Sequence, residues 1–127
     1  MIAHSYGTLM LSEVLKSDEY RDIKLGRVVL TGSIIRPDFD WQAVLARGQV
    51  NAVLCHYSAK DIPVRLAQFV IPGTGPSGYC GFNDRVNVTH AWETEFGHSD
   101  YFLEAHEERV LKGIWEPFLT RGGMMSE

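Results

Sequence analysis

Short apolar runs alternate along this chain with segments whose apolar residues recur at helical spacing. The runs predict strands at four places: residues 1–4, 27–31, 50–55 and 86–91. The helical spacing predicts helices at four others: residues 6–16, 41–46, 62–70 and 101–119. Between the third helix and the fourth strand, residues 72–84 are dense in Gly, Pro, Ser and Asn, and this composition predicts a loop.

Strands that alternate with helices imply a parallel sheet with helices on its faces. We therefore expect an α/β fold with three α/β/α layers built on a short, mainly parallel sheet of about four strands. The chain shows no internal repeat and no linker, so residues 1–127 are expected to form a single domain.

Composition and charge narrow the class of partner. Hydrophobic residues make up 45% of the chain and charged residues 22%, as in ordinary globular domains. The net charge of −4, without a basic stripe, argues against a nucleic-acid or anionic-membrane partner. The 2 cysteines make no disulfide framework, and no segment resembles a signal peptide or a transmembrane span. We expect a cytoplasmic protein.

The segment Ala3-His4-Ser5-Tyr6-Gly7 carries the strongest functional signal. It follows an apolar stub, precedes a predicted helix, and reads as a small residue, His, Ser, any residue and Gly. This is the pattern of a nucleophile elbow, a tight strand-to-helix turn that projects a serine hydroxyl out of the fold. Small neighbours are expected because a Cβ in such a crowded turn would clash. The alternative is that Ser5 is an ordinary helix N-cap.

A serine nucleophile needs a base, and the base needs an orienting acid. Asp61 follows the predicted strand 50–55, and His98 follows the strand 86–91. Because the carboxyl ends of parallel strands meet at one edge of a sheet, we expect both side chains to lie near Ser5. The order serine, acid, histidine is also the order found with a strand-elbow-helix architecture.

Each of these assignments has an alternative. Asp61 is also well placed to cap the helix that begins at residue 62. Asp38 or Asp40, after the preceding strand, is the second choice for the acid. His98 follows a glycine and is open to interpretation as a loop histidine that bonds the backbone.

From the elbow to the final helix, the chain resembles the C-terminal half of an α/β-hydrolase. Four further segments resemble one uncharacterised branch of that superfamily: residues 38–41, 73–82, 97–102 and 115–118. The resemblance implies that Ser5 is the nucleophile, His98 the general base and then acid, and Asp61 the orienting carboxylate. It also implies that the backbone N–H of Tyr6 is an oxyanion donor. No metal and no organic cofactor is implied.

The resemblance leaves out the strands that precede the elbow in that superfamily, together with the loop that donates the second oxyanion N–H. We therefore expect a truncated domain in which ester or amide hydrolysis is weak or absent. The strand at Met1–His4 would lie at an exposed sheet edge, which favours a homodimer or a complementing N-terminal half. The alternative function is a non-catalytic derivative that acts as a dimerising or complementing interaction module.

Other polar residues give weaker signals. Residues 73–78 fit G-x-G-x-x-G as a string, but they open no helix after a strand, so we do not expect a dinucleotide site. The remaining histidines are expected to be structural or solvated: His4, His56, His90 and His106. No spacing of His, Cys and carboxylates is typical of a zinc site.

Overall fold

The computed structural model describes residues 1–98 and 100–120 and contains one four-stranded, all-parallel sheet in the order β1-β2-β3-β4. The strands are β1 (Ile2–His4), β2 (Gly26–Thr31), β3 (Val50–Ser58) and β4 (Val88–Glu93). Strands that are consecutive in the chain are also neighbours in the sheet. The expected small α/β fold is therefore confirmed.

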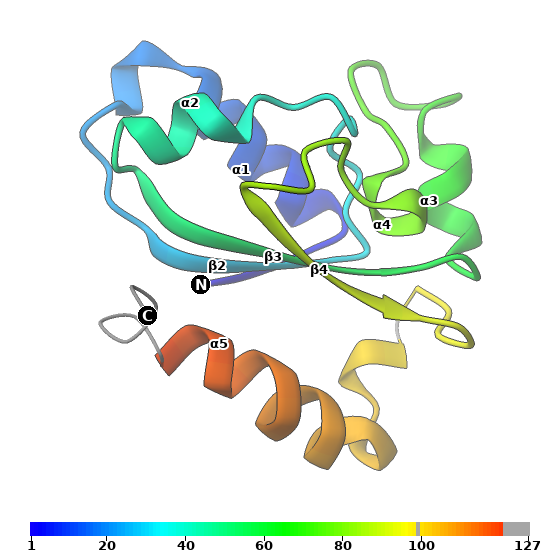
Figure 1. The fold of residues 1–127 in the computed structure, drawn as a ribbon. Helices are drawn as coiled ribbons and strands as arrows, with labels where there is room; N and C mark the ends of the chain where they lie inside the picture. The colour runs from blue at the N-terminus through cyan, green and yellow to red at the C-terminus, as the bar shows by residue number, and fades with distance from the viewer. Residues whose placement is uncertain (99, 121–127) are drawn as a thin grey trace.

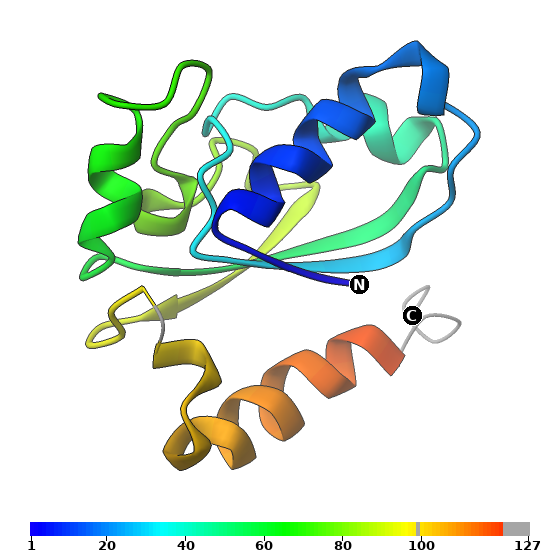
Figure 2. The ribbon, with the colours of Figure 1, turned by 180° about the vertical axis from the view of Figure 1, so that it is seen from behind.

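Helices cover both faces of the sheet (Figures 1 and 2). One face carries α1 (Tyr6–Lys16), α2 (Trp41–Ala46), α3 (Ile62–Ala67) and α4 (Ser77–Cys80). The opposite face carries the π-helical segment η4 (Glu108–Trp115) and its continuation α5 (Glu116–Thr120). Three short 3₁₀ turns complete the order: η1 (Asp18–Tyr20), η2 (Asp100–Phe102) and η3 (Glu104–His106).

Strand β2 shows why the two layers of helices are needed. Successive side chains of a strand point to opposite faces of its sheet. Val28 and Leu30 belong to the apolar cluster under α1 and α2, whereas Val29 belongs to the cluster that includes Trp115 and Phe118. Both faces of β2 are therefore buried, which explains its continuous apolar run without polar alternation.

The ends of several elements differ from the sequence expectation. Strand β3 continues to Ser58, three residues further than expected, and β4 lies two residues later than expected. Helix α3 ends at Ala67 rather than at residue 70. The expected loop 72–84 contains the short helix α4, which packs against β3 and α3. A single helical turn of this kind cannot be recognised in a Gly- and Pro-rich sequence, because the stability of the turn comes from tertiary contacts.

The expected continuous helix 101–119 is wrong. The chain forms η2 and η3 first, and they are separated by Leu103 in an extended conformation at φ −69° and ψ 138°. This break allows Tyr101 to be buried beneath the sheet while η4 begins a separate helical path. Throughout residues 1–98 and 100–120, the helices are too short or too polar to cross a membrane.

Helix α4 approaches the segment after β2 so closely that only glycine fits at the contact. A Cβ on Gly78 would lie 2.4 Å from the backbone N of Ser33, and the Gly78 N–H donates to the Ser33 carbonyl over 2.7 Å. Gly7 in helix α1 is the opposite case, since a Cβ there would meet nothing within 4 Å.

We predict that Gly78→Ala lowers the free energy of unfolding by about 1–3 kcal/mol, because the added methyl group forces the backbone of α4 away from Ser33. Gly7→Ala is the matched control, and it should stabilise α1 by up to about 1 kcal/mol. Urea unfolding of both variants measures the difference. Equal stabilities would show that the contact between α4 and residue 33 is not tight.

Candidate active site

The turn from β1 into α1 holds Ser5 in a strained conformation. Its φ is 55° and its ψ is −122°, and it is the one non-glycine residue with positive φ in the described part of the chain. The turn is fixed by the Ser5 N–H, which donates to the Thr31 carbonyl over 3.1 Å, and by the Thr8 hydroxyl, which donates to the Ser5 carbonyl over 2.6 Å. Such strain persists only where surrounding contacts hold it, and it is typical of functional turns.

The Ser5 hydroxyl begins a chain of hydrogen bonds through His98 to Asp61. Ser5 Oγ lies 2.7 Å from His98 Nε2, and His98 Nδ1 lies 3.0 Å from each carboxylate oxygen of Asp61. A neutral imidazole with its proton on Nδ1 satisfies the whole chain, because it donates to Asp61 and accepts from the Ser5 hydroxyl. The structure thus brings together the three side chains that the sequence singled out.

The hydrogen bonds of Ser5, Asp61 and His98 distinguish between the alternative roles of these residues. The Ser5 hydroxyl makes no cap bond to α1, so its interpretation as a side-chain N-cap is wrong. Asp61 does cap α3, since Oδ1 accepts from the Val64 N–H over 3.2 Å, and it bonds His98 as well. Both ring nitrogens of His98 bond side chains rather than the backbone.

The second choices for the acid are engaged elsewhere. Asp38 forms a bidentate pair with Arg36, with both N···O distances at 3.1 Å. Asp40 caps α2 by accepting from the Ala43 N–H over 3.0 Å. Asp61 is therefore the carboxylate that orients His98.

Two further contacts align the loops that carry Asp61 and His98. The buried Ser58 hydroxyl, at the end of β3, donates to the carbonyl of Phe96 over 2.6 Å. One residue later, the N–H of Gly97 donates to Asp100 Oδ2 over 2.7 Å and closes the turn around His98. No local pattern in the sequence indicates this role of Ser58, because its partner lies 38 residues away in the chain.

His4 and Gly32 enclose the other side of His98. The His4 ring lies 4.7 Å from the His98 ring, and its Nδ1 is 2.8 Å from the Thr31 hydroxyl oxygen. Burial, followed by the neighbouring His98, lowers the pKa of His4 below its ordinary value. Gly32 has φ 52°, and a Cβ there would lie 2.7 Å from His98 Cε1. Only glycine leaves room for His98 at this position. The one feature of the sequence that could have indicated Gly32 is that it directly follows the apolar run of β2.

The backbone N–H of Tyr6 is the candidate oxyanion donor. Tyr6 is the first residue of α1, so its N–H has no carbonyl within the helix to bond. The positive end of the helix dipole adds to its field. The expected steric need for Gly7 is wrong, however, because a Cβ there would meet nothing within 4 Å.

A second polar cluster lies inside the molecule and has a structural role. His56 is fully buried, with Nε2 2.7 Å from Glu93 and Nδ1 accepting from the Trp115 N–H over 3.0 Å. Burial lowers the pKa of His56, although Glu93 acts in the opposite direction. Arg109 pairs with Glu93 on the outside. The cluster fastens η4 to β3 and β4. Among the described residues, no group of His, Cys and carboxylates is placed to hold a metal ion.

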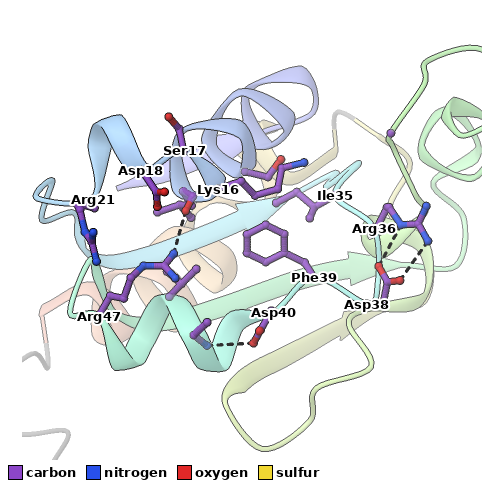
Figure 3. Close-up of a pocket in the computed structure, with 15 residues that line it drawn as sticks. Lys16, Ser17, Asp18, Arg21, Ile35, Arg36, Asp38, Phe39, Asp40 and Arg47 are labelled. Atoms are coloured by element: carbon purple, nitrogen blue, oxygen red, sulfur yellow. Dashed lines mark hydrogen bonds and ion pairs between the residues drawn. The ribbon is translucent and has the colours of Figure 1, made fainter.

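A pocket of about 510 Å³ lies away from the Ser5–His98 pair, between α1, α2 and the segment after β2 (Figure 3). Phe39 lies within it, and Arg21 and Arg47 stand at one end. Neither Ser5 nor His98 is among the residues that line it. We therefore take the hydrogen-bonded chain at the sheet edge as the candidate active site, because it joins a serine hydroxyl to an imidazole and a carboxylate.

We predict that Ser5→Gly has a free energy of unfolding about 1–2 kcal/mol higher than Ser5→Ala, because glycine adopts a positive φ without the clash of a Cβ. Both variants lack the hydroxyl, so the difference isolates the backbone strain. Chemical denaturation of the pair measures it. If the two variants are equally stable, the elbow is not strained.

No protein-family model, curated protein or solved structure matches this chain. The α/β fold and the hydrogen bonds of Ser5, His98 and Asp61 are therefore the observations from which a function can be argued.

Proposed function

We propose that this protein is a serine hydrolase of the α/β-hydrolase type, which transfers an acyl group from an ester or amide to water. The observation that carries the proposal is the 2.7 Å contact between Ser5 Oγ and His98 Nε2, with Asp61 on the far side of the imidazole. Nucleophile, base and orienting acid within hydrogen-bond reach define this chemistry by geometry and role.

In the first half-reaction, Ser5 Oγ attacks the substrate carbonyl carbon while its proton moves to His98 Nε2. Asp61 stabilises the imidazolium that forms, and the Tyr6 N–H stabilises the negative oxygen of the tetrahedral intermediate. His98 then returns the proton to the departing alcohol or amine, which leaves an ester on Ser5. In the second half-reaction, water attacks this ester, His98 takes its proton and gives it to Ser5 Oγ, and the free acid departs.

Tyr6 supplies one oxyanion donor, and the loss of one donor in other enzymes lowers kcat about a hundredfold or more. Labelling by a reactive phosphonate is a more sensitive test of Ser5 than a turnover assay, because one covalent modification of the hydroxyl can be detected by mass.

We predict that a fluorophosphonate adds one adduct to the wild-type chain, on Ser5, and none to Ser5→Ala. Asp61→Asn should slow labelling about a hundredfold or more, because the imidazole loses its orienting charge. Asparagine can still cap α3, so this variant separates chemistry from folding. Ser17→Ala is the control, since Ser17 is a half-buried serine that caps η1. Intact-mass and peptide mass spectrometry give the rate and the position.

Labelling of a folded wild-type chain at another residue, or no labelling at all, would contradict the proposal. Equal labelling of Asp61→Asn and wild type would leave Ser5 reactive but remove Asp61 from the mechanism.

A second proposal concerns the edge of the sheet at β1. Within the described residues, β1 pairs with β2 alone. Successive residues of β1 direct their backbone N–H and C=O groups alternately toward β2 and away from it. The carbonyl of Met1 and the N–H of Ser5 bond β2, so the N–H and C=O of Ile2 point away from β2, toward the open edge. An unpaired edge of this kind favours strand addition. We propose that a second copy of the chain, or a complementing polypeptide, binds along β1. If Ser5 is inactive, this pairing of β1 with another strand is the protein's role.

If the partner is a second copy, we predict that the wild-type chain is a dimer by size-exclusion chromatography with light scattering and that Ile2→Pro is a monomer. Proline removes one outward N–H and none of the bonds to β2. A monomeric wild type would exclude the second copy and leave the complementing polypeptide. A dimeric Ile2→Pro would place the contact elsewhere.

We also propose that the protein acts in the cytoplasm. Cys55 is buried and Cys80 is exposed, and both are free thiols. Unpaired cysteines are typical of proteins from a reducing compartment.

A further inference from the structure

The pocket of about 510 Å³ beside α1 and α2 has an apolar interior that the chemistry proposed for Ser5 does not use (Figure 3). Leu15, Ile35 and Val44 line it, and each of these side chains is at most 2% exposed. The half-buried ring of Phe39 stands among them. Pockets that bind small organic molecules have volumes of about 300–1,000 Å³ and are mainly apolar inside. This pocket therefore has the size and the interior of a ligand site.

The protein itself holds the segment that carries Phe39 in place. On one side of this ring, Arg36 and Asp38 form a bidentate ion pair. On the other side, Asp40 caps α2, and the N–H of Trp41 donates to the Phe39 carbonyl over 3.0 Å. The fully buried indole ring of Trp41 lies 4.6 Å from the Phe39 ring. A surface that is already ordered loses little conformational entropy when a ligand binds to it.

Two arginines at one end of the pocket have no carboxylate partner within residues 1–98 and 100–120 (Figure 3). Arg47 donates from Nε to the side-chain oxygen of Gln49 over 2.8 Å and from Nη2 to the Leu15 carbonyl over 2.9 Å. These bonds fix the guanidinium and leave most of its N–H groups for another acceptor. Within the same ranges, the exposed side chain of Arg21 makes no hydrogen bond or ion pair. The two guanidinium groups can therefore hold an anion through charge-assisted hydrogen bonds.

The carboxylates that line the pocket do not cancel this charge. Asp38 is paired with Arg36, and Asp40 is engaged as the cap of α2. Asp18 lies beside Arg21, whose backbone N–H donates to the Asp18 carbonyl over 3.3 Å. At this end of the pocket, two guanidinium groups therefore stand near one carboxylate (Figure 3). The local excess of positive charge contrasts with the net charge of −4 of the whole chain, and it favours a negatively charged ligand.

From this arrangement we infer that the pocket binds an organic anion with a flat apolar body, of the chemical class of the aryl carboxylates and aryl sulfonates. The apolar body packs against Phe39 and the buried side chains, and the acidic group accepts hydrogen bonds from Arg21 and Arg47. A sugar or a polyphosphate would leave the apolar interior unfilled, and a neutral hydrocarbon would not use the arginines. The inference does not rest on the proposed function, because the hydrogen-bonded chain that begins at Ser5 does not line this pocket.

Two fluorescent dyes with the same aromatic frame test the inference: anilinonaphthalene sulfonate, which carries an anion, and phenylnaphthylamine, which lacks it. Fluorescence titration and calorimetry give the stoichiometry and the Kd of each dye. We predict that one molecule of the sulfonate binds to each wild-type chain. Phe39→Leu keeps an apolar side chain against Trp41 but removes the flat ring, so it should raise the Kd of both dyes about threefold or more.

The charge at the end of the pocket is tested at two exposed residues, Arg21 and Asp18. Arg21→Gln should raise the Kd of the sulfonate about threefold or more, because one of the two cations is lost, and should leave the Kd of the neutral dye unchanged. Asp18→Asn should lower the Kd of the sulfonate about twofold or more, because it removes the neighbouring negative charge. Arg65→Gln is the matched control, since Arg65 is an exposed arginine on α3 outside the pocket.

Opposite shifts for Arg21→Gln and Asp18→Asn, seen with the sulfonate alone, would support the site, because a folding defect would weaken the binding of both dyes. No binding of the sulfonate to the folded wild-type chain, or several molecules bound with equal affinity, would overturn the inference. A loss in Arg65→Gln as large as that in Arg21→Gln would also overturn it, because the dye would then report general surface charge. Equal affinity of the sulfonate for wild type and Arg21→Gln would remove the arginine from the site and contradict the anion.

Discussion

The parallel direction of all four strands is the constraint on which the rest of the structure depends. In a parallel sheet the carboxyl ends of the strands share one edge, and the loops that leave this edge meet there. Ser5 leaves β1, Asp61 follows β3 and His98 follows β4, so residues that are 93 positions apart in the chain come within hydrogen-bond distance. An antiparallel β4 would carry His98 to the opposite edge.

Asp61 belongs both to the cap of α3 and to the hydrogen-bonded chain that leads to Ser5. Its carboxylate is fully buried, and burial of a charge is costly unless hydrogen bonds compensate it. The Val64 N–H at the start of α3 and the imidazole of His98 supply those bonds. The helix cap fixes the carboxylate, and the carboxylate holds the plane of the imidazole. The position of Ser5 is fixed separately, by the bonds between the elbow and Thr31 and Thr8.

The sequence was sufficient for the features that depend on local pattern. Apolar runs located all four strands, and the small-His-Ser-x-Gly segment located the elbow, because both are written in consecutive residues. It was not sufficient for features that depend on distant contacts. Gly32 makes room for His98, and Ser58 bonds Phe96, but neither residue has a local pattern that names its partner. Helical periodicity likewise predicted one helix over 101–119, where the chain instead buries Tyr101 and is extended at Leu103.

The proposed chemistry depends on the position of one proton on the His98 ring. If Ser5, His98 and Asp61 act as a unit, the neutral imidazole of His98 carries its proton on Nδ1, toward Asp61, and offers the lone pair of Nε2 to the Ser5 hydroxyl. The ¹⁵N chemical shifts of the two ring nitrogens distinguish the tautomers directly, with Ser5→Ala and Asp61→Asn as references. The account predicts a fixed Nδ1–H tautomer in the wild type that is lost in Asp61→Asn and kept in Ser5→Ala. A wild-type ring protonated on Nε2, or an even mixture of tautomers, would contradict it.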